Sequence, residues 1–424
     1  MEVTEETVQL VERVAALDIG KASLMACIRA PHERVAGRRS QEVAEYRTTT
    51  VDLLRLADRL RRFGVTRVAM EATSDYWKPA YYLLEAEGFE CWLLNASHVK
   101  NVPGRPKTDK LDAVWLAKVV ERGMCSPSFV PPKPIRRLRD LTRYRRSLIR
   151  DRAREKQRVE KLLEDAQIKL SVVASDMFGV SGRAMLSALI AGQRDPVILA
   201  DLAKGRLRAK ISGLREALTG HFDDHHALIC AKMLSRIDAL TADIADVTVA
   251  VEAAISPYAA QVAQLDEVTG VGVVCAQEII AEVGVDMSVF PTAAHLASWA
   301  KVSPRANQSA GKTKAATTGK GNPWLASTLG EITAVAARSN TFLGERYRRL
   351  SRRRGKLRAI VATSNSLLVV VWHLLADPDA HFHDLGPGFH DTRYHQRHQH
   401  NLIRELERVT GQKVTLNPQN DAAA

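Results

Sequence analysis

The sequence contains few cysteines and no long uncharged apolar run. Its five cysteines are scattered and form no C-x-x-C pair, which argues against a zinc module or a disulfide framework and is typical of a reducing cytoplasm. Because a membrane helix needs about eighteen consecutive apolar residues, we expect no membrane span. The acidic, amphipathic start, MEVTEETVQLVERV, is unlike a signal peptide. We therefore expect a cytoplasmic protein without a membrane partner.

Acidic residues are scarce in two strongly basic stretches. Lys133–Lys161 holds thirteen Lys or Arg against four Asp or Glu, and Arg346–Arg358 holds eight basic residues and no acid. These stretches carry +9 and +8, so the remainder of the chain contributes −4 to the net charge of +13. Clustered positive charge is typical of a surface that binds nucleic-acid phosphates. We expect Arg145 and Arg146 to contact phosphates; the alternative is a solvated helix face.

Residues 12–127 alternate between strand and helix patterns. Period-two and short apolar stretches predict strands, and apolar residues three and four apart predict helices. The expected strands cover 13–20, 23–30, 42–50, 66–73 and 90–96, and the expected helices cover 51–64, 78–88 and a stretch from Lys107. The order β-β-β-α-β-α-β-α predicts an α/β domain with a mixed sheet covered by helices.

Beyond the prolines at 127–134, the patterns predict a mainly helical chain. The first helix is expected from about Ile135 to about Leu170, within a helical, coiled-coil region over 133–257. A heptad seam is formed by Cys230, Met233, Ile237, Leu240, Ile244, Val247, Val251 and Ala254. Such spacing does not tell whether the partner helix belongs to the same chain or to a second copy. The seam therefore fits either the wall of a helical bundle or a dimer interface.

Residues 260–376 are expected to form a mainly helical domain, and 377–424 a tail. Gly270 and Gly272 in VTGVG resemble the turn of a helix-hairpin-helix, whose backbone N–H groups can face a phosphate. The alternative is a turn where two helices pack. The tail contains six histidines, and we expect it to be poorly ordered; the alternative is a metal-binding tract.

Four acids in the first 125 residues are candidates for a metal site. Asp18 and Glu71 end two predicted strands, and Asp109 and Asp112 lie one helical turn apart. Read locally, the two helical acids are as well suited to capping the helix and facing its positive end. Buried acids are costly unless paired or bound to a cation. If the strands are neighbours, the four carboxylates converge, and hard oxygen ligands favour Mg²⁺, with Mn²⁺ as an alternative.

Several motifs resemble the DEDD insertion-sequence transposases of the IS110 family over residues 12–375. The matching stretches are ALDIGK, AMEATSDYW, GRPKTDKLDAVWLAK, FGVSGRAMLSALIAGQRDP, VTGVGVVCAQEIIAEVG, VSPRANQSAGK and TGKGNPWLASTL. The resemblance implies an RNase-H-like, RuvC-like N-terminal domain and a C-terminal transposase domain. It also implies that Asp18, Glu71, Asp109 and Asp112 bind the metal.

The resemblance further implies a serine nucleophile in the C-terminal domain. Ser309 matches that position, although Ala310 stands where the family usually has glycine, and Ser303 before Pro304 is the second candidate. Lys312 and Lys314 lie close enough in sequence to help neutralise a phosphate. The implied function is Mg-assisted DNA strand cleavage, exchange and religation by a transposase guided by a structured noncoding RNA.

The implied partners are double-stranded donor and target DNA, the guide RNA, and further copies of the chain in a dimer or tetramer. The implied location is the bacterial cytoplasm, at the nucleoid. Two other functions fit part of the pattern. One is a junction-selective endonuclease that hydrolyses DNA with the four acids alone. The other is a non-catalytic nucleic-acid-binding protein, which needs only the basic stretches and the glycine turn.

Overall fold

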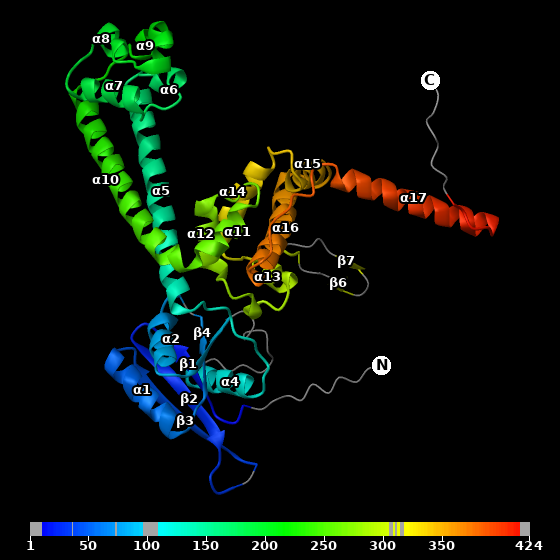
Figure 1. Cartoon of the computed structure of the whole chain (residues 1–424). Helices are drawn as coiled ribbons and strands as arrows, with labels where there is room; N and C mark the ends of the chain where they lie inside the picture. Colours follow the sequence, from blue (N-terminus) through cyan, green and yellow to red (C-terminus); the bar gives the residue numbers. More distant parts are fainter. Residues whose placement is uncertain are drawn as a thin grey trace. The chain divides into compact units, whose positions relative to one another are not determined.

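The computed structural model describes residues 11–35, 37–72, 74–95, 109–304, 308–309, 312–313 and 318–415. The side chains of 109, 110, 308, 309, 312, 313 and 390–398 lie outside the described part of the chain. Contacts divide the chain into two compact units, Met1–Val130 and Pro131–Ala424, each of which is described by itself (Figure 1).

The first unit is built on a mixed five-stranded sheet. Its elements are β1 Val14–Ile19, β2 Ser23–Pro31, β3 Arg39–Arg47, α1 Thr50–Arg62, β4 Arg67–Glu71, α2 Trp77–Ala86, β5 Glu90–Leu94 and α4 Asp109–Glu121. The strand order is β3-β2-β1-β4-β5. The three N-terminal strands pair antiparallel, whereas β4 and β5 run parallel to β1. This is the RNase-H-like arrangement, and the predicted order of elements is confirmed.

Alternation along the strands gives the sheet two apolar faces. Ala15, Leu17 and Ile19 of β1 pack in one core with α1 and α2. Val14 and Ala16 belong to the other core, which contains residues of α4. Because successive side chains of a strand point to opposite faces, helices cover both sides of the sheet and bury each set of apolar residues.

The second unit is almost entirely helical in its described part. Its α-helices are α5 Lys133–Asp165, α6 Leu170–Val173, α7 Val180–Ile190, α8 Pro196–Asp201, α9 Ile211–Ala217, α10 Asp224–Ile255, α11 Ala259–Asp266, α12 Val273–Val283, α13 Ala293–Trp299, α14 Pro323–Ala336, α15 Phe342–Arg354, α16 Lys356–Ala376 and α17 Phe389–Thr410. Short 3₁₀ turns are η1 Gly205–Lys210, η2 Ser256–Tyr258 and η3 Met287–Val289, and two-residue strands are β6 Gln308–Ser309 and β7 Lys312–Thr313.

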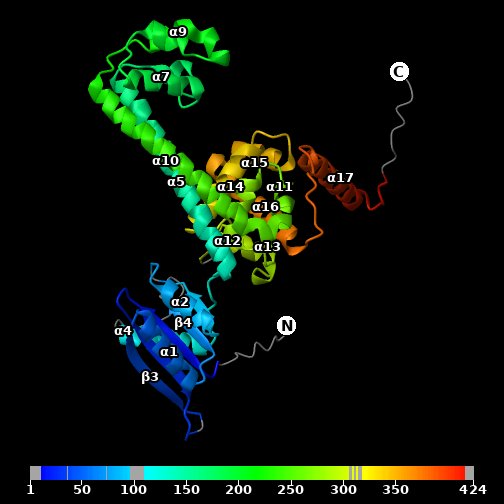
Figure 2. The ribbon, with the colours of Figure 1, turned by 60° about the vertical axis from the view of Figure 1, so that its left-hand side comes forward.

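The heptad seam of α10 packs against α5 of the same chain. The two long helices lie side by side in both views (Figures 1 and 2), and they share more contacts than any other pair of elements. Arg152 of α5 donates a hydrogen bond to Thr241 of α10 across the pair, with an N–O distance of 3.4 Å. Part of the seam, including Cys230, Ile237 and Val251, is therefore buried within one chain. Leu240, Ile244 and Val247 are only partly buried.

Helix α16 is the apolar core helix of the C-terminal part. It is the one described helix that is long and apolar enough to cross a membrane by length and composition. Its buried residues, among them Leu367, Leu368 and Val371, pack within the protein against neighbouring helices α13, α14 and α15.

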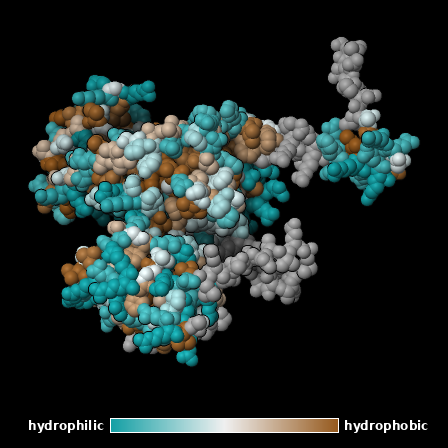
Figure 3. All heavy atoms as spheres, turned by 60° about the horizontal axis from the view of Figure 1, so that its bottom comes forward, coloured by the Kyte–Doolittle hydropathy of each residue, from teal (hydrophilic) through white to brown (hydrophobic). Residues whose placement is uncertain are grey.

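The surface visible in Figure 3 is mostly hydrophilic, with apolar side chains scattered in small groups.

The first residues after 377, part of the predicted tail, are hydrogen-bonded to Gln264 and Glu267. The side-chain amide of Gln264 donates to the carbonyls of Asp377, Pro378 and Ala380. The carboxylate of Glu267 accepts the Phe382 N–H at 2.8 Å. The chain then forms helix α17, whose last three turns carry apolar residues at helical spacing, Leu402, Leu406 and Val409.

Candidate active site

The structure brings Asp18 and Glu71 to neighbouring positions of one sheet edge. Strands β1 and β4 are parallel, and Leu17 pairs with Met70, so Asp18 and Glu71 are the next residues on the two strands. Leu17 and Met70 both belong to the α1–α2 core. Alternation therefore directs Asp18 and Glu71 to the opposite face, which α4 covers. Glu71 is only 9% exposed.

Helix α4 is oriented so that its acidic start lies toward this same edge. At its other end, the Glu121 carboxylate accepts a hydrogen bond from Arg29 at 2.9 Å, and it also pairs with Arg39. Arg29 pairs across the sheet with Val14, four residues before Asp18. Nine residues of helix and four residues of strand both span about 13 Å. A helix that runs back along β1 from Glu121 therefore brings Asp112 to the level of Asp18.

Asp109 begins α4, but its side chain lies outside the described residues. Among the side chains that are described, no three His, Cys, Asp or Glu residues form a metal-binding group. The structure thus places Asp18 and Glu71 on one face and the start of α4 at the same end. The described side chains do not form a cluster of three metal ligands. The predicted donors are all carboxylate oxygens, a chemistry that suits a hard divalent cation such as Mg²⁺ better than zinc.

Glu121 is a positioning residue that the sequence analysis missed. Its carboxylate is 4% exposed and links the end of α4 to two arginines of β2 and β3. Glu121→Gln should destabilise the protein by about 1.5–3 kcal/mol, the value of hydrogen bonds to charged groups. The DNA cleavage expected from the sequence should also slow, because α4 carries Asp112, a predicted metal ligand.

The matched control is Asp58→Asn on α1, since Asp58 pairs with Arg61 on the surface at 3.1 Å. Denaturant unfolding and cleavage of a DNA substrate measure both effects. If Glu121→Gln is as stable and as active as Asp58→Asn, Glu121 does not hold α4 in place.

The segment between Ala300 and Gly321 in the second unit, called the serine-bearing loop because it contains Ser309, has its two ends close together. A Cβ atom on Gly321 would lie 2.4 Å from the carbonyl oxygen of Ala300, so glycine permits the two ends of the loop to touch. Within the loop, Ser309 of β6 pairs with Lys312 of β7. Directly paired residues of antiparallel strands have Cα atoms about 5 Å apart. Lys314 lies outside the described residues.

Ser303 has a structural partner at the entrance of the loop. Its hydroxyl oxygen accepts a hydrogen bond from the side-chain amide of Asn365 on α16, at 3.1 Å. Lys301, two residues earlier, has a positive φ of 60°. Ser303 therefore contributes to fixing the turn from which the loop departs.

The two glycines of VTGVG have different surroundings. Gly270 has a φ of +94°, and a Cβ atom there would lie 3.1 Å from the carbonyl oxygen of Ile332 on α14. This close approach explains why glycine is needed at Gly270. Gly272 precedes α12 and has open space around it, and Val273 and Val274 after it are half exposed. The Gly272 end of the turn is therefore more exposed than the Gly270 end.

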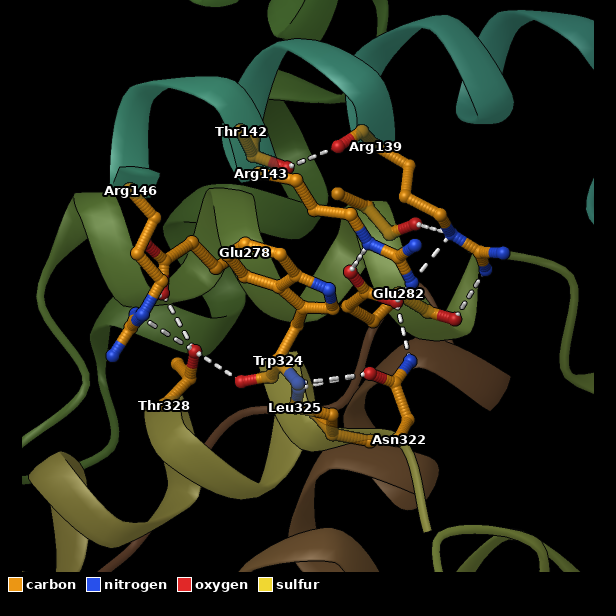
Figure 4. A network of polar contacts seen from close by, with 11 residues as sticks. Arg139, Thr142, Arg143, Arg146, Glu278, Glu282, Asn322, Trp324, Leu325 and Thr328 are labelled. Carbon is orange, nitrogen blue, oxygen red and sulfur yellow. Dashed lines mark hydrogen bonds and ion pairs between the residues drawn. The ribbon is translucent and has the colours of Figure 1, made fainter. Parts of the chain in front are cut away.

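The structure corrects the expectation that Arg145 and Arg146 contact phosphates. They are 3% and 7% exposed, respectively. Arg146 forms an ion pair with Glu278 of α12 (Figure 4). It forms another with Glu331 of α14 and donates a hydrogen bond to Ser327 at 2.9 Å. Burial lowers the pKa of Arg145, which the charge of Glu278 partly offsets. Some arginines of α5 are therefore buried inside the protein and do not present their charge to a phosphate at the surface.

Neighbouring arginines of α5 complete this internal network. Arg143 binds both carboxylate oxygens of Glu282, at 2.7 and 2.8 Å. Arg139 donates to the carbonyls of Ala281 and Glu282 at the end of α12. The side chains converge between α5, α12 and the start of α14 (Figure 4). Glu278 and Glu282, four residues apart in a mostly apolar helix, are the sequence signal that could have revealed these partners.

Arg146→Ala should destabilise the protein by about 3–5 kcal/mol, because removing one member of a buried pair leaves the other charge unpaired. The control is Arg154→Ala, which removes an exposed pair with Asp151 on the same helix and should cost less than about 1 kcal/mol. Urea unfolding monitored by circular dichroism compares the two. Equal stability of the two variants would contradict a structural role for Arg146.

Two family models match the chain. One, described as a transposase and carrying the DEDD and IS110 designations, matches residues 15–168. The other, described as the transposase IS116/IS110/IS902 family, matches residues 262–348. No curated protein matches the chain.

Solved structures that match part of the chain include RuvC of Thermus thermophilus. The sequence of this RuvC is 16% identical to the present chain, with a TM-score of 0.22. The match covers 27% of the present chain and 99% of the RuvC chain. T. thermophilus RuvC in complex with a Holliday junction substrate is 15% identical, with a TM-score of 0.20 and the same coverage. The RNase-H-like strand order and the two family matches define a transposase, a DNA-modifying enzyme. The chain belongs to the IS110 family of insertion-sequence transposases.

Proposed function

We propose that the protein is an RNA-guided recombinase that cleaves, exchanges and rejoins the DNA strands of its insertion sequence. The observation that carries the proposal is the acidic edge of the first unit. Asp18 and Glu71 are next to each other on parallel strands, and α4 is anchored so that its acidic start lies toward them. Acids at the ends of two neighbouring core strands are costly unless a cation or a partner compensates their charge.

We assign Asp18, Glu71, Asp109 and Asp112 to holding Mg²⁺, with Mn²⁺ as an alternative. When bound, such a cation supplies Lewis-acid polarisation of a phosphate and stabilises the charge on the departing oxygen. The four carboxylates hold and orient the cation, and their own negative charge is neutralised by it.

We assign Ser309 as the nucleophile. Its hydroxyl oxygen forms a bond to the phosphorus as the bond from phosphorus to the 3′ oxygen of DNA breaks, and the serine proton ends on that 3′ oxygen. One phosphodiester bond replaces another, so the cut strand can be rejoined without a high-energy cofactor. The pairing of Ser309 with Lys312 supports a cationic surrounding for the phosphate. Lys314, two residues further along the sequence, is a second candidate for this role.

The further partners are proposals of the same kind. We propose a structured noncoding RNA that selects donor and target DNA, and assembly of the chain as a dimer or tetramer. Exposed basic residues and the backbone at Gly272 are candidates for nucleic-acid contacts. We propose domains at 12–127, 133–257 and 260–376 with a tail at 377–424, and a place in the bacterial cytoplasm at the nucleoid.

One experiment separates this function from its two alternatives. The purified chain is incubated with its guide RNA, DNA carrying the insertion-sequence ends, and Mg²⁺, and the reaction is stopped with denaturant. Our proposal requires DNA attached covalently to the protein. Cleaved DNA with no attached protein would favour a hydrolytic junction endonuclease, which needs the acids but no serine. Intact DNA in every metal condition would favour a non-catalytic binding protein.

A further inference from the structure

A basic groove lies beside the two ends of the serine-bearing loop. Its volume is about 860 Å³, and the loop contributes Pro304 before Ser309 and Thr318 after it. Val302, near the start of the loop, also lines the groove. The rest of the lining comes from α15 and α16, which are joined at Gly355 with a φ of +83°. The groove is thus formed within the second unit and adjoins the segment that presents Ser309.

The charge of the groove is positive and uncompensated by acids in its lining. Arg346, Arg354 and Arg358 line it, and none of the described lining residues is Asp or Glu. The nearest acid on α15, Glu345, is 3.6 Å from Arg348, whose guanidinium also donates to two main-chain carbonyls. Glu345 therefore neutralises a different arginine, and the groove favours an anionic ligand.

Arg346 is the residue best placed to bind such an anion. Its Nε atom is buried and has no hydrogen-bond partner in the described part of the chain. Burial, and after it the charge of Arg349, lower the pKa of Arg346. A desolvated guanidinium with an unused N–H gains most from a phosphate, which accepts two parallel hydrogen bonds and neutralises the charge.

Apolar residues alternate with these arginines along the groove. Leu350 lies between Arg346 and Arg354, and Leu357, next to Arg358, is 80% exposed. A small inorganic anion would not cover these leucines. A nucleic-acid strand presents both chemistries, because its phosphates are anionic and its sugars and base edges have apolar surface.

We propose that this groove binds the phosphodiester backbone of the DNA strand that approaches the serine-bearing loop, with Arg346 and Arg358 as phosphate contacts. The choice of DNA over RNA rests on the proposed function, since the strand next to Ser309 is the one that is cut. Asn365, which lines the groove and donates to Ser303, ties the groove wall to the start of the loop. The groove therefore positions the strand relative to the loop.

The test measures binding of the full chain to a fluorescent DNA duplex of mixed sequence, and to an RNA strand of equal length, across a salt series. Counterion release predicts that Arg346→Gln and Arg358→Gln each weaken DNA binding about eightfold at 0.1 M salt and reduce the salt slope by about 0.9. Arg352→Gln is the control, because Arg352 is an exposed arginine of α15 outside the groove lining.

Each outcome bears on the groove separately from the nucleophile. Equal losses in Arg352→Gln and the groove variants, or a loss confined to RNA, would overturn the DNA groove. Arg358→Gln keeps the test valid if Arg346→Gln fails to fold, since Arg358 is exposed. Ser309→Ala should bind DNA like the unmodified chain. If Ser309→Ala also cleaves DNA while the groove variants lose binding, the proposed nucleophile fails and the groove stands.

Discussion

Asp112→Asn is expected to lower the rate of DNA strand cleavage about a thousandfold, because loss of Lewis-acid stabilisation costs several kcal/mol and each 1.4 kcal/mol is tenfold in rate. The carboxylate of Asp112 lies one turn into α4, on the helix that packs on the face to which Asp18 and Glu71 point. Asparagine has nearly the same shape but carries no charge, so the helix and its packing should be retained.

Cleavage of labelled DNA over a Mg²⁺ titration measures the effect, and the thermal unfolding curve reports the fold. Asp109→Asn should behave in the same way. Asp58→Asn, an exposed acid of α1, is the matched control and should cleave normally. Cleavage at an unchanged rate in both Asp109→Asn and Asp112→Asn would mean that these residues cap the helix and do not bind the metal. A large loss of stability in Asp112→Asn would mean that its role is structural.

The acidic edge was predictable because it depends on local pattern and strand order. Asp18 and Glu71 end short apolar strands, and three strands followed by alternation leave few ways to arrange a mixed sheet. The pairing of Leu17 with Met70 confirms that these strands are neighbours. The anchor at Glu121 was not predictable, since its partner Arg29 is ninety-two residues away in sequence.

The basic helix shows where reasoning from charge fails. A count of charges over Lys133–Lys161 treats every arginine as exposed, but Arg146 is paired with Glu278, 132 residues further on. Helical spacing shows which residues share a face but not what that face meets. The same limit applied to α10, whose heptad spacing did not tell that α5 of the same chain packs beside it.

Of the candidate site residues, Ser309 receives the least support from sequence pattern alone. A lone serine in a polar loop has no local signature of a nucleophile, so its assignment depends on the family resemblance rather than on spacing. The described backbone adds the pairing of Ser309 with Lys312 and the closed base of the loop at Gly321. The groove beside Pro304 and Thr318 could not be predicted, because its walls come from three separate segments.

Ser309→Ala is expected to abolish both the covalent protein–DNA adduct and the recombinant product, while DNA and RNA binding persist. Alanine removes the only atom that would bond to phosphorus, so no slower route through the same residue exists. Denaturing gels of reactions stopped midway detect the adduct, and mass spectrometry of its peptide identifies the attached residue. A nucleotide on the peptide containing Ser309, absent from Ser309→Ala, is the expected result.

Ser303→Ala is the matched control, six residues upstream in the same loop. Its hydroxyl accepts a hydrogen bond from Asn365, so its loss should reduce activity modestly by loosening the turn, at a cost of about 1 kcal/mol or roughly fivefold in rate. Adduct should still form on Ser309 in this variant. A nucleotide found on Ser303 instead would move the nucleophile to the entrance of the loop. Recombinant product formed by Ser309→Ala would exclude the serine and leave the carboxylates to activate water.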